Sequence, residues 1–386
     1  MAKKVPLCRP ELNKEELNLI KEVLDSGWLA HGPKVKDFEE RFAKYIGKKY
    51  AISLNSCASA LQAAIMAHEL KGEIILPSFT FPASANAIEN AGCRPVFVEI
   101  RKDTFNIDID EIKKNITENT VGIMPVHYAG QSCEMDKIMD IAEQHNLVVV
   151  EDSAEAIGTL YNNKKTGSFG IGCFSFYPTK NMTTGEGGMV TTDNEKIAER
   201  VKAIRGHGVV KGAYERNKLN IPWIRVASLS GYNFRMNEIS AALGLRQLDK
   251  LDEMNEKRQK LAAYMTKKLS NFKQITTPYI DLKGTHVYQM YVIKLNETVD
   301  RDKFVLFLRN NGIEASVHFD PPVHLHTYYS EKYGYKEGNL TITEKISKQI
   351  VTLPMYPSMT KDQIGRVIKV IEMALKNVWN KKIKNT

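Results

Sequence analysis

One lysine, Lys180, stands behind an aromatic and apolar run in the segment SFYPTKNMTTGEGG, residues 175–188. A lysine that bonds covalently to a carbonyl compound must reach into a pocket and lose its ammonium proton there. An apolar strand that leads into a glycine-containing loop could supply such a setting. Because most lysines are solvated surface cations, the segment by itself also fits a lysine beside an ordinary turn.

Two adjacent acids, Glu151 and Asp152, end an apolar segment, residues 147–152, that is typical of a buried strand. A carboxylate in that place must be solvated, paired or functional, because burial of an isolated charge is costly. Asp152 could hold a protonated ring nitrogen or a metal ion, or it could cap a following helix. Neither His127 nor His145 shows ligand spacing relative to these acids, so we expect no metal site.

A third candidate is the loop NSCASAL, residues 55–61, which follows a strand-like segment and opens a helix. Ser56 and Cys57 are small, so the backbone N–H groups at the helix start are accessible. Such groups, together with the helix dipole, bind phosphate. The same residues also fit a simple helix cap made by Asn55 or Ser56.

Together these three signals match the needs of one cofactor, pyridoxal 5'-phosphate. Its phosphate requires N–H groups and hydroxyls, and its aldehyde requires a lysine. Its pyridine nitrogen requires a carboxylate in order to stay protonated. The sequence therefore predicts that the three segments meet in one cofactor site.

The elements that must position these residues alternate along the first three-fifths of the chain. Short apolar segments predict strands at 73–77, 94–100, 121–127, 147–152, 172–176 and 187–192. Helical patterns lie at 58–70, 82–91 and 135–145. This alternation predicts an α/β fold with a mainly parallel sheet between helices. Ligands of such sheets bind at the carboxyl ends of the strands, and the candidate residues follow the predicted strands.

The C-terminal part of the chain has a different pattern. A long helical stretch from about 237 to 269 could connect a large domain to a smaller one. Beyond it, residues 286–295 alternate like a strand, residues 302–312 predict a helix that ends at Gly312, and residues 361–377 predict an amphipathic helix. Since 386 residues are too many for one core, we expect a large domain at 1–250 and a smaller α+β domain at 251–386.

Composition restricts the class of protein. The net charge is +9, but the basic residues are interspersed, so we expect no nucleic-acid partner. The five cysteines form no C-x-x-C pair and no disulfide framework, which is typical of reduced thiols in the cytosol. No apolar run suits a signal peptide or a bilayer span. We therefore expect a cytoplasmic protein that is not bound to a membrane.

The chain resembles the DegT/StrS family of sugar aminotransferases, which has the aspartate-aminotransferase fold type. The resemblance extends over almost the whole chain from residue 27. Four motifs carry it: PSFTFPASANAI at 77–88, EDSAEAIG at 151–158, SFYPTKNMTTGEGGMV at 175–190 and GYNFRMNEISAALG at 231–244. The resemblance implies a seven-stranded type of sheet and pyridoxal 5'-phosphate as cofactor.

Carried over to this sequence, the family pattern implies roles for individual residues. Lys180 would bond to the cofactor's aldehyde, and Asp152 would pair with its pyridine nitrogen. Phe81 would stack on the cofactor ring, although it also fits ordinary core packing. Glu155 falls where many relatives have histidine or glutamine near the cofactor's 3-hydroxyl, and some have glutamate. This departure leaves the local protonation state and the substrate preference open.

Other implied contacts concern the phosphate and the second subunit. Ser56 and Cys57, through backbone N–H groups, and Ser175, through its hydroxyl, would bind the cofactor's phosphate. Asn233 would reach the phosphate in a neighbouring subunit. The resemblance therefore implies a homodimer with a shared active site.

Four residues are candidates for contact with substrate. His318 and His324, in ASVHFDPPVHLHTYY, could contact substrate phosphate or sugar hydroxyls, or they could be structural histidines. His207 and Arg225 are further candidates of the same kind.

The resemblance implies transfer of an amino group from L-glutamate, which leaves as 2-oxoglutarate, to a nucleotide-linked keto sugar. A 4-keto-6-deoxy hexose is the common substrate type of the family, which makes amino sugars for surface polysaccharides. The sequence leaves open the sugar, the nucleotide (UDP, GDP or dTDP), and amination at C4 or C3. Alternatives are a non-catalytic regulatory member that binds the cofactor, and a pyridoxamine-dependent sugar dehydratase, in which histidine replaces the lysine.

Overall fold

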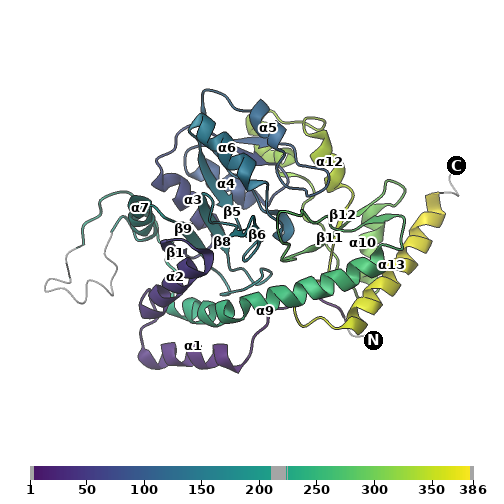
Figure 1. Cartoon of the computed structure of the whole chain (residues 1–386), viewed down its shortest axis with the longest axis horizontal. Helices are drawn as coiled ribbons and strands as arrows, with labels where there is room; N and C mark the ends of the chain where they lie inside the picture. Colours follow the sequence, from purple (N-terminus) through teal and green to yellow (C-terminus); the bar gives the residue numbers. More distant parts are fainter. Residues whose placement is uncertain (1–3, 210–222, 224, 383–386) are drawn as a thin grey trace.

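The computed structural model describes residues 4–209, 223 and 225–382 of the chain. Two sheets form a larger and a smaller lobe, and the helix α9, Glu238–Leu269, runs beneath both (Figure 1). The Asn237 side chain caps α9 by accepting a hydrogen bond from the Ser240 N–H at 2.8 Å. The helix predicted from about 237 to 269 is therefore confirmed.

The larger sheet has seven strands in the order β1-β9-β8-β5-β4-β2-β3. In that order their bounds are Tyr50–Leu54, Gly188–Thr192, Ile171–Ser175, Val148–Asp152, Thr120–Ile123, Glu73–Pro77 and Arg94–Val98. Strand β9 is antiparallel to both of its neighbours, and the other pairs are parallel. This confirms the mainly parallel sheet. Because β9 runs in the reverse direction, its first residue lies beside the last residues of β1 and β8.

Helices cover both faces of this sheet, as the α/β pattern predicts (Figure 1). In β2, Ile74 and Leu76 join the core on one face and Ile75 joins the core on the other, because successive strand residues point to opposite faces. The first face is covered by α3, α4 and α7, at Cys57–Ala67, Pro82–Asn90 and Glu195–Arg205. The second is covered by α5 and α6, at Ile109–Lys114 and Met135–His145.

A third cluster packs α9 against α2, Pro33–Ile46, and the loop after β8. Helix α1, Lys14–Ser26, lies alongside α9. Glu238 of α9 caps α2, since its buried carboxylate accepts hydrogen bonds from the N–H groups of Gly32, Lys34 and Val35 at 3.0, 2.9 and 2.8 Å.

The smaller lobe has an antiparallel sheet of β10, β11 and β12, at Ile275–Thr276, Tyr291–Leu295 and Ile350–Leu353. Its core is covered by α10 and α13, at Arg301–Asn310 and Lys361–Lys382. Between these two in the chain, α11 and α12, at Thr327–Tyr333 and Thr341–Ser347, pack on the larger lobe: Tyr329 of α11 lies in the core of the large sheet, and the Thr343 N–H of α12 donates to Glu99 at 2.8 Å. The strand predicted at 286–295 begins only at Tyr291. The preceding residues bond to the larger lobe instead: the N–H groups of Val287 and Met290 donate to the carbonyls of Gly130 and Ala129.

Short elements complete the description: η1 at Tyr128–Gly130, η2 at Val323–Leu325, and the hairpin of β6 and β7 at Leu160–Tyr161 and Lys164–Lys165. Within the described residues, no helix combines the length and apolar character that a bilayer span requires.

An N-terminal strap, residues 5–8, packs on the smaller lobe. Val5 forms a β-bridge with Ile313 and lies in that lobe's core. The Leu7 carbonyl accepts a hydrogen bond from the Met355 N–H at 3.1 Å. The division at residue 250 remains a prediction, and the strap crosses it in space.

Candidate active site

A cavity of about 490 Å³ opens at the carboxyl edge of the large sheet. Five of the residues singled out in the sequence for lysine, acid and phosphate chemistry line it: Ser56, Cys57, Asp152, Glu155 and Lys180. Ser175, Phe81 and His318 line it as well. The sheet explains this convergence, because the ends of β1, β5 and β8 and the start of β9 meet at this edge.

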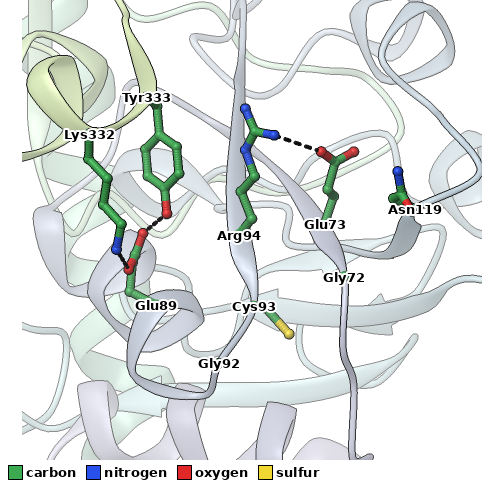
Figure 2. A pocket seen from close by; sticks show the side chains of 9 residues that line it. All are labelled: Gly72, Glu73, Glu89, Gly92, Cys93, Arg94, Asn119, Lys332 and Tyr333. Carbon is green, nitrogen blue, oxygen red and sulfur yellow. Dashed lines mark hydrogen bonds and ion pairs between the residues drawn. The ribbon is translucent and has the colours of Figure 1, made fainter.

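A second hollow, of about 590 Å³, lies at the opposite edge, where β2 and β3 begin beside α11 (Figure 2). Its charged groups are paired with one another. Lys332 Nζ lies 2.6 Å from Glu89 Oε2, and Arg94 Nη1 lies 3.3 Å from Glu73 Oε1. It contains none of the candidate residues. Since parallel sheets bind ligands at their carboxyl edge, we assign the chemistry to the smaller cavity.

Lys180 lies in the loop between β8 and β9, with its side chain only 16% exposed. Its Nζ donates a hydrogen bond to Glu155 Oε1 at 3.3 Å. The other oxygen, Glu155 Oε2, accepts the Ala129 N–H at 2.8 Å. Lys180 is therefore a cavity lysine held by an acid and not a solvated surface cation.

Asp152, the last residue of β5, is buried at the cavity wall. Its Oδ2 accepts a hydrogen bond from Ser84 Oγ at 2.7 Å, and its Oδ1 accepts the Ala154 N–H at 3.1 Å. Burial raises the pKa of Asp152, and these two hydrogen bonds oppose the rise. The helix that Asp152 might have capped does not exist, because residues 153–158 form turns.

Its neighbour Glu151 points away from the cavity and is fully buried. Oε1 accepts the N–H groups of Phe169 and Gly170 at 2.8 and 2.7 Å. Oε2 accepts the Gly167 N–H at 2.8 Å and lies 3.1 Å from His127 Nε2. Alternation along β5 thus gives the two acids different surroundings.

Helix α3 presents its N-terminus to the cavity. Ser56 caps it by accepting the Ser59 N–H at 3.1 Å, so the predicted cap and the accessible helix start are both present. The N–H groups of Cys57 and Ala58 occupy the first helical turn, where no intrahelical acceptor exists. Gly188 permits this arrangement, because a Cβ there would stand 2.2 Å from the Ser56 carbonyl oxygen.

Two further cofactor candidates flank the helix start and the lysine. Ser175, at the end of β8, lines the cavity. Phe81, the residue before α4, is 61% exposed. The core-packing alternative for Phe81 is therefore wrong, and its ring is available at the cavity.

The two histidines of the C-terminal segment have different places. His318 lines the cavity, its Nδ1 lies 2.9 Å from Thr352 Oγ1, and burial lowers its pKa. His324 is fully buried outside the cavity lining. Its ring nitrogens lie 2.6 Å from Ser78 Oγ and 3.2 Å from Glu344 Oε1, so it ties β2 to α12.

Asn233, His207 and Arg225 are exposed and lie outside the cavity lining. Arg235 links the first two, with Nε donating to Asn233 Oδ1 at 3.0 Å and Nη2 lying 3.2 Å from His207 Nε2. A role for Asn233 in a neighbouring subunit stays a prediction.

The sequence did not single out several residues that shape the site. Ser84, which donates a hydrogen bond to Asp152, lies in the first turn of α4 and within the motif at 77–88. Its position in that motif is the signal that could have identified it. Gln289 Nε2 donates to the Thr179 carbonyl at 2.9 Å and so fixes the peptide before Lys180. Gln289 and the strap residues Leu7 and Cys8 come from distant parts of the chain, and no local pattern marks them.

This donor set fits pyridoxal 5'-phosphate. A helix start with available N–H groups can bind a phosphate. A buried carboxylate whose pKa is raised gains from a protonated ring nitrogen, which supplies the missing positive charge. A lysine in the same cavity can bond to an aldehyde.

Comparisons with known proteins agree with this chemistry. Residues 10–372 match the model of the DegT/DnrJ/EryC1/StrS aminotransferase family. The spore coat polysaccharide biosynthesis protein SpsC of Bacillus subtilis is 38% identical, with 96% of this chain and 97% of that protein covered. The GDP-perosamine synthase of Caulobacter vibrioides is 36% identical, with 96% and 98% covered. The structure of Helicobacter pylori PseC, an aminotransferase involved in pseudoaminic acid biosynthesis, superposes with a TM-score of 0.90 at 28% identity and covers 97% of this chain and 100% of that one.

Proposed function

The chain belongs to the DegT/DnrJ/EryC1/StrS aminotransferase family, and on that premise we propose that it transfers an amino group from L-glutamate to a nucleotide-linked keto sugar. Enzymes of this family depend on pyridoxal 5'-phosphate. One observation carries the proposal: Lys180, Asp152 and the N-terminus of α3 line a single cavity.

The residues around the cavity divide the binding of the cofactor among them. Ser56, Cys57 and Ser175 would hold the phosphate, since they surround the start of α3. Asp152 would hold the ring nitrogen, and the exposed face of Phe81 would cover the ring. When bound, pyridoxal 5'-phosphate supplies a reactive carbonyl carbon and an electron-withdrawing ring.

Lys180 would both anchor the cofactor and move the proton. After the amino donor has displaced it, Nζ would take the proton from the donor's α-carbon and deliver it to the C4′ carbon of the cofactor. The same lysine would serve the reverse sequence with the keto sugar, so the two half-reactions share one site. Ping-pong kinetics follow from this sharing.

The sugar substrate is proposed by analogy with relatives. The likeness to GDP-perosamine synthase supports a sugar carried on a nucleoside diphosphate, and the likeness to a spore coat polysaccharide protein supports a role in polysaccharide biosynthesis. On this basis we propose a 4-keto-6-deoxy hexose as the acceptor. His318 would contact this substrate, because it lines the cavity on the side of the smaller lobe. A homodimer in which Asn233 serves the neighbouring site, and a cytoplasmic location, complete the proposal.

The visible spectrum tests the assignment of the lysine. Purified protein with cofactor should absorb in the visible range, and L-glutamate should bleach that band. Lys180→Ala should abolish the borohydride-reducible link, whereas Lys164→Ala, at an exposed lysine in the β6–β7 hairpin, should keep it. A reducible link that persists in Lys180→Ala would refute the assignment.

A panel of nucleotide-linked keto sugars tests the substrate. Each sugar is incubated with the enzyme and L-glutamate, and mass spectrometry reads the amino sugar and 2-oxoglutarate. If 2-oxoglutarate forms but no member of the panel yields an amino sugar, the reaction with L-glutamate would be supported and the proposed keto-sugar acceptor would be refuted.

A further inference from the structure

One buried amide on helix α9 joins the two loops that carry the candidate chemistry. Asn255 is 6% exposed and does not line the cavity. Its Nδ2 donates to the Ile157 carbonyl at 3.0 Å, and its Oδ1 accepts a hydrogen bond from Asn181 Nδ2 at 2.5 Å. Ile157 lies in the turns that follow Asp152, and Asn181 comes directly after Lys180. A single side chain therefore holds both loops from behind the cavity.

The sheet alone does not set the relative position of these two loops. The register of β5 and β8 ends at the pair of Asp152 and Cys173. Glu155 and Lys180 both lie beyond this pair, in the turns at 153–158 and in the loop between β8 and β9. Past the last pair of the sheet, the separation of the loops depends on other contacts, and the Asn255 amide supplies one to each loop.

The hydrogen bonds also fix the orientation of both amides. A carbonyl oxygen only accepts, so the Asn255 NH2 group must face Ile157, and its oxygen must face Asn181. The Asn181 NH2 group then donates both to Asn255 and to the Val287 carbonyl, which lies 3.1 Å away. This short chain of bonds therefore runs in one direction and ends beside Lys180.

The packing around Asn255 is tight. A Cβ on Gly158 would stand 2.7 Å from Asn255 Nδ2 and 2.6 Å from the Tyr45 hydroxyl oxygen. The backbone of the turns at 153–158 thus approaches α9 at a distance that a side chain on Gly158 would prevent. The Asn255 amide has little room to move, so it can act as a fixed reference for both loops.

The lysine loop has a second anchor on the other side of Lys180. Gln289 Nε2 donates to the Thr179 carbonyl at 2.9 Å, whereas Asn181 bonds to Asn255 and Val287. Of these anchors, Asn255 is the one that also bonds to the turns at 153–158. It is therefore the contact that refers the lysine to the acids.

We propose that Asn255 is a positioning residue that sets the separation between Lys180 and the acid side of the cavity, where Asp152 and Glu155 lie. The distance of 3.3 Å between Lys180 Nζ and Glu155 Oε1 measures this separation. A cofactor held at Asp152 must bring its aldehyde to Lys180 Nζ, and a misplacement of reacting groups by about 1 Å can slow a reaction about 100-fold. The inference rests on the proposed role of Lys180 as the anchoring lysine.

Timed trapping of the covalent link tests this inference. Asn255→Ala protein freed of cofactor is mixed with pyridoxal 5'-phosphate and reduced with borohydride at set times, and mass spectrometry quantifies the modified Lys180 peptide. The limiting rate constant at high cofactor concentration should fall by about 10- to 100-fold. The cofactor concentration that gives half of this rate should change by less than about threefold, because Asp152 and the start of α3 keep their own contacts.

Gln259→Ala is the matched control. Gln259 lies about one turn further along α9, and its amide donates to the His286 carbonyl at 3.2 Å. The substitution removes an amide from the same helix without touching either loop, so the limiting rate constant should equal that of the wild type.

A double variant tests whether Asn255 acts through Asn181. Asn181→Ala removes the other end of the same bond and should slow the link by a similar factor. The double variant should be no slower than the slower single variant, because both substitutions break one connection.

A limiting rate constant within about threefold of the wild type in Asn255→Ala would overturn the inference. A half-saturating cofactor concentration that rises as much as the rate falls would overturn it too, because general damage to the site would then explain both. If Asn255→Ala does not fold, Asn181→Ala decides by the same two measurements.

Because no amino donor takes part in this assay, its outcome is separable from that of the proposed function. A slower link in Asn255→Ala, in a protein whose wild type fails the glutamate half-reaction, would leave this inference standing and remove the function. An unchanged rate in an active aminotransferase would do the reverse. A wild type that forms no link at Lys180 would refute both.

Discussion

Replacing each of the two adjacent acids at the end of β5 by its amide should damage different properties of the protein. Glu151→Gln should reduce stability and leave cofactor binding largely intact. Asp152→Asn should weaken cofactor binding and leave stability intact or improved. The reason is that the Glu151 carboxylate accepts backbone N–H groups of residues 167–170 and does not line the cavity, whereas Asp152 does.

The cost of Glu151→Gln follows from its hydrogen bonds. The carboxylate accepts three backbone N–H groups, those of Gly167, Phe169 and Gly170. An amide oxygen can accept two of them, so at least one buried N–H loses its acceptor, at about 1–3 kcal/mol. Loss of the charge on the remaining bonds adds about 1 kcal/mol. We expect a total of about 2–4 kcal/mol, which lowers the melting temperature by about 4–8 °C at roughly 2 °C per kcal/mol.

In the cofactor-free protein, Asp152→Asn should change the free energy of unfolding in the opposite direction from Glu151→Gln. Because burial raises the pKa of Asp152, the folded state binds its proton more tightly than the unfolded state does. The free energy of unfolding therefore falls as the pH rises from the unfolded to the folded pKa, and the cost persists at neutral pH. The amide removes this cost and also removes the partner of the cofactor's ring nitrogen.

Thermal melts of the cofactor-free variants and absorbance titrations with pyridoxal 5'-phosphate measure the two properties. The wild type, Glu151→Gln and Asp152→Asn are compared at the same pH. A wild-type melting temperature for Glu151→Gln would refute the hydrogen-bond argument. Loss of cofactor affinity in Glu151→Gln together with its retention in Asp152→Asn would refute the division of roles.

Three further substitutions probe the site and its supports. Phe81→Ala should weaken cofactor binding measured by absorbance and leave the melting temperature unchanged, because the side chain is 61% exposed; a fall in melting temperature would count against this. Gly188→Ala should lower the free energy of unfolding by about 1–3 kcal/mol, since its Cβ would meet the Ser56 carbonyl oxygen at 2.2 Å. It should also weaken phosphate binding, which is measured by competition between inorganic phosphate and the cofactor. Glu238→Ala should cost about 2–6 kcal/mol by denaturation, because two buried N–H groups at the start of α2 lose their acceptor; a cost below 1 kcal/mol would contradict the capping role.

Periodicity in the sequence was sufficient to predict the edge of the sheet at which the site forms. Apolar strands followed by small or acidic residues placed Ser56, Asp152 and Ser175 at strand ends, and the sheet brings those ends together. The family pattern then supplied the roles that remain proposals. Strand ends were less accurate where tertiary bonds competed: residues 286–290 bond to the loop at 129–130 and leave the strand.

Partners distant in the sequence could not be predicted in this way. His324 was a substrate candidate because of its segment, but Ser78 and Glu344 surround its ring. Ser84 reaches Asp152 across 68 positions. Such pairs depend on how helices pack onto the sheet. The residues next to His324 and next to Ser84 in the chain do not indicate which distant residue each will contact.

The strap gives the folding of this chain a particular order in time. Leu7 donates its N–H to Glu314 across 307 positions, and its carbonyl bonds to Met355. During synthesis, residues 5–8 must therefore remain without these partners until residues 312–355 have left the ribosome, whereas the β8–β9 pair can form from neighbouring segments. Contacts of such long range close late and slowly. The cavity wall at Leu7 and Cys8 should thus be among the last parts of the site to assemble, so that a nascent chain holds its lysine loop before it holds a finished pocket.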